Sequence, residues 1–226
     1  MTTAVQQPVA QFYPRVAVDA VLFTLASGEL KTLLVKIKKG PFVERWAFPG
    51  GLVQVGESLD DAARRELYEK TGVQDLYLEQ LYTFGDARRD PVAHTVAVAY
   101  FALVPYLTHE LHSGEKYADI DWFPVRALPQ LAYDHNAIAA YALQRLQAKL
   151  GYTNIVYSLL PREFTLAELQ EIYEVILNQQ LDRRNFRRKI LALGLLKPLR
   201  KTRRGAHRPA TLYTFTRRSP MNIEVL

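Results

Sequence analysis

The residues best suited to do chemistry lie between positions 50 and 73, where carboxylates are spaced for one face of a helix. Glu66 and Glu69 are three positions apart, so a helix brings them to the same face, and position 70, four after Glu66, joins them. Carboxylate oxygens gathered in this way are ligands that hard divalent cations prefer. Residue 70 is a lysine, so a cation shares this face with the two carboxylates.

The whole segment, GGLVQVGESLDDAARRELYEKTGV, resembles the Nudix box. The matching residues are Gly51, Glu57, Arg65, Glu66, Leu67, Glu69, Gly72 and Val73. The resemblance implies a Nudix fold, in which such carboxylates hold a divalent metal against a pyrophosphate and one can serve as the base for the attacking water. We expect Arg65 to pair with a nearby carboxylate, Glu57, and so to orient the loop.

Lys70 departs from the box, because it stands where the family has its second paired glutamate. At about 4 Å and an effective dielectric of about 20, each pair of unit charges is worth roughly 4 kcal/mol. Losing an attraction and gaining a repulsion therefore weakens metal binding strongly. We expect no required cofactor, at most weak binding of Mg²⁺ by Glu66 and Glu69, and no efficient hydrolysis.

A second group of candidate functional side chains lies on a helix predicted near the carboxyl end of the chain, Leu181–Leu193. Its apolar residues share one face, whereas four arginines lie opposite or beside that face, and no acid follows the capping Asp182. Guanidinium groups on a short helix can grip phosphates or read guanine in the major groove of DNA. The predicted DNA-contacting residues of the helix are Arg183, Arg184, Arg187 and Arg188.

A basic loop, Lys201–Pro209, follows this helix and separates two predicted strands. Its cations are Lys201, Arg203, Arg204 and Arg208, which can reach phosphate or a minor groove. From residue 153 to the end the chain has 14 Lys and Arg against 6 Asp and Glu, whereas the first 152 residues have 15 against 17. The net positive charge is therefore concentrated from residue 153 to the end, which favours an anionic polymer as partner.

The elements that must position these residues fall into two domains, 1–152 and 153–226. Strands are predicted at 16–25, 30–38, 46–48, 76–84, 95–104 and 120–124, with helices at 58–71 and 136–150, which describes an α/β body with a mixed sheet. A linker of residues 152–163 carries apolar residues that should pack. Thr165 and Glu168 form a capping box, and helix, helix and two strands at 195–200 and 210–216 give the order of a winged helix-turn-helix domain.

This pairing of a Nudix-like domain with a basic winged helix resembles the NrtR family, the Nudix-related transcriptional regulators of NAD metabolism. The resemblance is carried by the Nudix box, by FGDARRDP at 84–91, by LDRRNFRRKILALGLL at 181–196 and by RRGAHRPATLYTF at 203–215. It implies a repressor of genes for NAD biosynthesis or salvage, a homodimer on a palindromic double-stranded DNA operator, and ADP-ribose or a related nucleotide as effector. Family members commonly have eroded Nudix boxes, in agreement with Lys70.

The predicted ligand contacts in the first domain are cations for phosphate and a ring for the base or ribose. They are Lys36, Arg45, Arg88, Arg89 and Phe84. His94 and His135 are expected to be structural or exposed, because neither has metal-ligand spacing to another histidine.

Two alternatives stay open at this point: a Nudix-type regulator that senses a sugar, and an active ADP-ribose pyrophosphatase whose basic tail is incidental or binds RNA. A cytoplasmic protein fits the absence of cysteine and of any apolar run near the ~18 residues that span a membrane.

Overall fold

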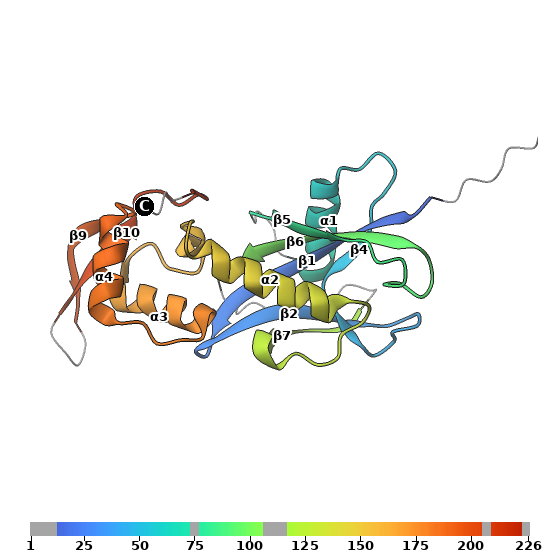
Figure 1. Cartoon of the computed structure of the whole chain (residues 1–226), viewed down its shortest axis with the longest axis horizontal. Helices are drawn as coiled ribbons and strands as arrows, with labels where there is room; N and C mark the ends of the chain where they lie inside the picture. Colours follow the sequence, from blue (N-terminus) through green and yellow to red (C-terminus); the bar gives the residue numbers. More distant parts are fainter. Residues whose placement is uncertain (1–12, 73–76, 106–116, 205–208, 223–226) are drawn as a thin grey trace, which may run out of the picture.

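The computed structural model describes residues 13–72, 77–105, 117–204 and 209–222, and within these ranges it contains two sheets and the helices that cover them (Figure 1). The larger sheet comprises β1 (Arg15–Ala26), β2 (Glu29–Ile37), β3 (Trp46–Ala47), β4 (Gly50–Leu52), β5 (Glu79–Phe84), β6 (Thr95–Leu103) and β7 (Tyr117–Pro124). Its order is β3-β2-β1-β6-β5, with β4 paired to β1 and β7 to β2. Because β1 and β6 run parallel and the other pairs antiparallel, the predicted mixed sheet is confirmed.

Helices cover both faces of this sheet. Side chains alternate along β1, so Val21 and Phe23 join the core beneath α2 (His135–Lys149), whereas Leu22 joins the core on the opposite face. That opposite face is covered by α1 (Leu59–Thr71), as Figure 1 shows. The α1 boundaries follow the sequence signals, since the Ser58 hydroxyl accepts from the Asp61 N–H and Gly72 ends the helix with a φ of 70°.

The second unit is the predicted winged helix. After a short turn η2 (Ile155–Ser158) come β8 (Phe164–Thr165), α3 (Leu166–Leu177), α4 (Arg183–Ala192), β9 (Leu196–Arg203) and β10 (Ala210–Phe215). The Thr165–Glu168 capping box is present at the start of α3, and the Asp182 carboxylate caps α4. The apolar residues of the predicted linker are packed into the core, as expected.

Four details of the sequence interpretation need correction. The small sheet has a third strand, β8, which pairs with β10, and β9 continues through Arg203, so Lys201 and Arg203 lie in a strand rather than in a loop. Residues 50–52, for which no strand is predicted, form β4, because glycines there allow the backbone to lie against β1. β7 begins at Tyr117, three residues before the predicted start, because it pairs with β2 along that whole length.

The two units share one hydrophobic core, which runs from Phe23 in the large sheet to Phe164 and Phe215 in the small one. Two polar contacts join them as well: Arg126 Nη2 and Gln147 Nε2 donate to the Ile176 carbonyl oxygen at 3.2 and 2.9 Å. Both contacts satisfy an acceptor at the carboxyl end of α3. The division at residue 152 stays a prediction. No helix in the described part of the chain is long and apolar enough to span a membrane.

Candidate functional site: a polar pocket and a basic helix

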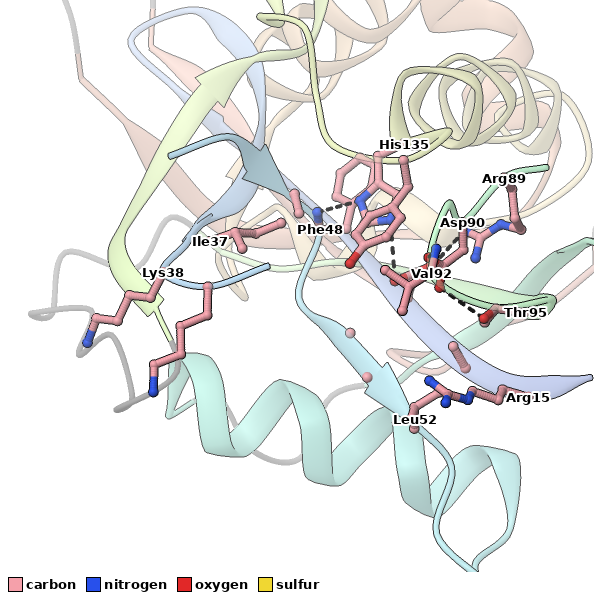
Figure 2. A pocket seen from close by; sticks show the side chains of 17 residues that line it. Arg15, Ile37, Lys38, Phe48, Leu52, Arg89, Asp90, Val92, Thr95 and His135 are labelled. Atoms are coloured by element: carbon pink, nitrogen blue, oxygen red, sulfur yellow. Dashed lines mark hydrogen bonds and ion pairs between the residues drawn. The ribbon is translucent and has the colours of Figure 1, made fainter. Parts of the chain in front are cut away.

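A pocket of about 590 Å³ opens in the larger unit between β1, β4 and the start of α2 (Figure 2). Its walls combine cations, carboxylates and rings. The lining residues are Arg15, Ala17, Asp19, Ile37, Lys38, Lys39, Ala47, Phe48, Gly50, Gly51, Leu52, Arg89, Asp90, Val92, Thr95, Tyr133 and His135. A pocket of this size can enclose a nucleotide-sized ligand.

The best-buried cation of the pocket is Arg89, only 3% of whose side chain is exposed. Its Nε and Nη2 donate to the two carboxylate oxygens of Asp134 at 3.0 and 2.7 Å. Nη2 also lies 3.5 Å from Oδ2 of Asp19. This bidentate pair fixes the guanidinium plane, so the wall of the pocket is rigid at this point.

His135 begins α2 and is 97% buried against the same wall. Its Nδ1 accepts a hydrogen bond from the Phe48 backbone N–H at 2.9 Å, and the two rings stack with centroids 5.5 Å apart (Figure 2). Burial lowers the pKa of His135, and this effect outweighs the opposite one of the Asp19 carboxylate. The imidazole is therefore neutral near pH 7, and because Nδ1 is an acceptor, the proton sits on Nε2.

The open side of the pocket is cationic. Arg15, Lys38 and Lys39 line it and are exposed. Figure 2 places Arg15 and Lys38 at opposite margins, with Phe48 and His135 between them. Cations at the margins and rings at the centre suit a ligand with phosphates and a planar or sugar ring.

The Nudix loop borders this pocket through Gly50 and Gly51, and its charged residues form a closed network. Arg65 donates to Glu57 through Nε at 2.6 Å and Nη2 at 2.9 Å, and through Nη1 to Glu66 at 2.7 Å. A Cβ on Gly51 would lie 2.3 Å from Glu66 Oε1, so a larger residue there would displace this carboxylate from Arg65. The expected pairing of Arg65 with Glu57 is present in the structure.

This network makes a testable contribution to stability. The hydrogen bonds from Arg65 lower the pKa of Glu57 from its ordinary 4.5 to about 2. Because the folded pKa lies below the unfolded one, the stabilisation is complete above pH 4.5 and disappears as the pH falls towards 2. We expect Glu57→Gln to lower the melting temperature at pH 6 and to match the unsubstituted protein near pH 2, as followed by circular dichroism. A constant difference between the two proteins from pH 6 to 2 would contradict this assignment.

Among the described residues no group of three or more His, Asp or Glu side chains is placed to hold a cation. Glu57 and Glu66 are both engaged by Arg65, whose own pKa is raised by these contacts, and Glu69 Oε2 lies 3.7 Å from the same guanidinium. Arg65 therefore balances the charge of these carboxylates in the structure, and weak binding of a divalent ion by Glu66 and Glu69 stays a prediction. Lys70 lies in α1, and its side chain is outside the described part of the structure.

Of the five ligand contacts predicted from the sequence, Arg89 lines the pocket and four do not. Lys36 pairs with Glu44 at 2.6 Å, and Arg45 is exposed. Phe84 packs against Tyr82 and Tyr141. Arg88 is almost fully exposed beside Asp86. Their contact with a ligand stays a prediction.

Sequence reasoning missed the residues that build the pocket wall: Asp19, Phe48, Tyr133 and the buried His135. One signal was available, since Asp19 is a lone carboxylate inside the apolar run VAVDAVLF. His94 is exposed, and His135 is buried and hydrogen-bonded, within the two alternatives expected for these residues.

The second candidate surface is the solvent-facing side of α4. Its buried side carries Ile190, and Phe186 packs edge-on against Tyr173 of α3 with ring centroids 5.2 Å apart. The four predicted arginines, Arg183, Arg184, Arg187 and Arg188, are all exposed. Arg183 and Arg187 also line a groove of about 470 Å³ between α4, the start of α3 and β10. The helix therefore offers a dense, accessible row of cations.

The other predicted DNA contacts have different surroundings. Lys201 Nζ lies 2.6 Å from Glu163, and Arg203 is paired with Glu168. Arg204 is exposed at the end of the strand, and Arg208 lies outside the described residues. Lys201 and Arg203 thus have local carboxylate partners and Arg204 extends beyond them. Their contact with DNA stays a prediction.

Comparison with known proteins agrees with both units. Residues 13–146 match the NUDIX domain family, and residues 156–215 match the NrtR DNA-binding winged helix domain. A protein of Acinetobacter baylyi named ADPR responsive transcriptional repressor NtrR is 37% identical over 89% of this chain and 82% of its own length. Shewanella oneidensis NrtR, crystallised with a 27mer DNA, superposes with a TM-score of 0.76 at 35% identity, covering 89% of this chain and 93% of that one.

The isolated NUDIX domain of Shewanella oneidensis NrtR, crystallised with ADP ribose, is also similar: 38% identity and a TM-score of 0.56 over 63% of this chain and 95% of that domain. The similarity to the Acinetobacter and Shewanella proteins extends through both units and the connection between them. The chain belongs to the NrtR family of Nudix-related transcriptional regulators.

Proposed function

We propose that this protein is an ADP-ribose-responsive transcriptional repressor that binds operators of NAD-metabolism genes as a homodimer in the cytoplasm. The observation that carries the proposal is the exposed arginine row of α4, on a winged helix joined by a continuous core to a polar pocket. Helices of this kind enter the major groove, and dimers match the two half-sites of a palindromic operator. The DNA complex and the ADP-ribose complex of the Shewanella protein support the two partners.

The pocket chemistry agrees with ADP-ribose as effector. The exposed cations Arg15, Lys38 and Lys39 suit a diphosphate, and the stacked rings of Phe48 and His135 form part of the pocket wall. The same features suit a free sugar less well, because a pentose carries no phosphate for three cations to neutralise.

Helix α2 connects the pocket with the winged helix. It begins at His135 in the pocket wall and carries Gln147, which donates to the Ile176 carbonyl at the end of α3. A ligand that changes the position of α2 thereby changes the support of α3. Such a ligand regulates DNA binding only if it favours one arrangement over the other.

The test is a gel-shift titration with DNA from upstream of NAD-metabolism genes, with and without ADP-ribose. We expect specific binding at moderate salt and a change in affinity when ADP-ribose is added. ADP and a free pentose are the comparison ligands. A shift caused by the pentose and not by ADP-ribose would favour a sugar-sensing regulator, and the absence of specific binding would contradict the repressor. Size-exclusion chromatography with light scattering tests the dimer.

A separate prediction concerns hydrolysis. The unsubstituted protein should release no measurable AMP from ADP-ribose in the presence of Mg²⁺, because Lys70 places a cation on α1 where the Nudix box has its second paired glutamate. We expect Lys70→Glu to gain slow Mg²⁺-dependent release, since it supplies a third carboxylate one turn after Glu66. Lys70→Gln is the matched control, which removes the cation without adding a ligand. Rapid turnover by the unsubstituted protein, unchanged by Lys70→Glu, would identify a pyrophosphatase instead.

A further inference from the structure

The feature with no assigned role is Asp19, a carboxylate in the middle of the apolar strand β1. Its residue exposure is 6%, yet it lines the pocket. The neighbours on the strand are buried aliphatic side chains, so the position would suit an apolar residue for folding alone. A buried carboxylate is costly unless its oxygens receive hydrogen bonds.

A positively charged side chain lies near the Asp19 carboxylate, but the neighbouring groups do not use all of its positions for accepting hydrogen bonds. Oδ2 accepts no hydrogen bond from any residue in the described part of the chain. Arg89 Nη2 approaches it at 3.5 Å, but the guanidinium is already engaged by Asp134 through two shorter bonds. The His135 Nε2, which carries the proton, lies 3.6 Å from Oδ1. Arg89 therefore supplies a nearby positive charge, while the capacity of Asp19 Oδ2 to accept hydrogen bonds is left open.

The backbone opposite also makes room for this carboxylate. A Cβ on Gly50 would lie 2.2 Å from Asp19 Oδ1, so a side chain at position 50 would collide with it. Gly50 pairs with Asp19 between β4 and β1. The glycine and the carboxylate together form a built part of the pocket wall.

Of the groups in a nucleoside diphosphate sugar, only those that donate hydrogen bonds fit against the Asp19 carboxylate. A phosphate would be repelled by it, and the exposed cations at the margin of the pocket offer phosphate a better place. Sugar hydroxyls are the most numerous donors of such a ligand, and hydrogen bonds to an ionised acceptor are the stronger kind. The Asp19 carboxylate beside Arg89 would also weaken the binding of a competing ligand that carries only anionic groups.

We propose that Asp19 is a specificity-determining residue that accepts hydrogen bonds from ribose hydroxyls of the bound effector. The inference rests on the proposed function, since it assumes that the effector is ADP-ribose and that it occupies this pocket. ADP-ribose contains two riboses, so the shared chemistry is the hydroxyl donor. Separate ligand fragments decide which ribose supplies it.

The experiment is calorimetric titration of the full-length protein and of Asp19→Asn, which keeps the shape of the side chain and removes its charge. We expect Asp19→Asn to bind ADP-ribose about 10-fold or more weakly, the range for one charged hydrogen bond. ADP carries only the adenosine ribose, and ribose 5-phosphate carries only the terminal one. The fragment that holds the contacted ribose should lose affinity in the variant, whereas the other should not.

Two controls show whether a loss of affinity for ADP-ribose is specific to Asp19. Glu171→Gln makes the same loss of charge on an exposed residue of α3 outside the pocket and should leave the affinity for ADP-ribose unaltered. The melting temperatures of the unliganded proteins check the fold, and Asp19→Ala is a second variant if Asp19→Asn does not fold.

Three outcomes separate the proposal from its premise. If Asp19→Asn binds ADP-ribose as tightly as the unsubstituted protein, the role of Asp19 is overturned and the repressor function is untouched. If ADP and 2′,3′-dideoxyadenosine diphosphate weaken equally in the variant, the donor is the adenine rather than a ribose, which also overturns it. If the unsubstituted protein does not bind ADP-ribose at all, the proposed function itself fails.

Discussion

Replacing both Arg184 and Arg188 with alanine lowers the affinity of the protein for its operator by about 100-fold, since each phosphate or base contact is worth ~1–3 kcal/mol. Both side chains are exposed on α4, on a helix whose opposite face is fixed by Ile190 and by the contact of Phe186 with Tyr173. The substitutions leave that packing face intact. The loss should therefore appear in DNA binding and not in the melting temperature.

The measurement is fluorescence anisotropy with a labelled operator at several salt concentrations. If the two arginines contact phosphates, the slope of log affinity against log salt decreases by about one for each. If they read bases, the slope is unchanged and the preference for the operator over random DNA is reduced. Arg64→Ala removes one positive charge from an exposed position on α1 and serves as control for each of the single substitutions. If the double variant binds the operator with unchanged affinity, α4 is not the helix that contacts the DNA.

Asp134→Ala is expected to destabilise the fold by roughly 3 kcal/mol, at the low end of the range for breaking a buried ion pair. It leaves the Arg89 guanidinium, 3% exposed, without its bidentate partner. The effect stays below that of a fully buried pair because Asp134 is 23% exposed and Asp19 remains 3.5 Å away. The melting temperature should fall by about 6–12 °C for a protein of this length.

The control is the neighbouring pair on the same loop. Asp86 and Arg88 lie 3.6 Å apart with side chains 62% and 92% exposed, so Asp86→Ala should lower the melting temperature much less, through loss of the 2.8 Å hydrogen bond from the Arg88 N–H to Asp86 Oδ1. In the Asp134→Ala background, Arg89→Leu should recover part of the lost stability, because the unpaired buried charge is then removed. Equal melting temperatures for Asp134→Ala and Asp86→Ala would mean that the buried pair has no structural role.

The parts of the fold that sequence alone predicted are those with local signals. Helix α1 has a capping serine before it and a left-handed glycine after it, and α3 has its capping box, so the start or end of each is encoded within a few residues. Strand β8 has no such signal, because it is two residues long and exists through its pairing with β10, nearly fifty positions later. The continuation of β9 through Arg203 likewise depends on pairing with β10, in which Ala210 lies opposite Arg203.

The site divides in the same way. The Nudix loop was predictable because Glu57, Arg65 and Glu66 lie within ten positions and a helix fixes their geometry. The pocket wall was not, because Asp19, Arg89 and Asp134 come from β1, a loop and the start of α2, and their spacing in the sequence contains no period. Arg89 was chosen for its charge alone, and the partners that orient it emerge only from the fold.

The single core that passes through both units has a consequence for how long the protein survives. An effector present at a free concentration of 100 times its dissociation constant adds about 2.7 kcal/mol to the free energy of unfolding. Because Phe164 and Phe215 of the winged helix pack into the same core as Phe23 beneath the pocket, opening the winged helix also disturbs the part of the chain that holds the effector. Proteases act on opened chains. We therefore expect the metabolite that regulates DNA binding also to protect the repressor from proteolysis.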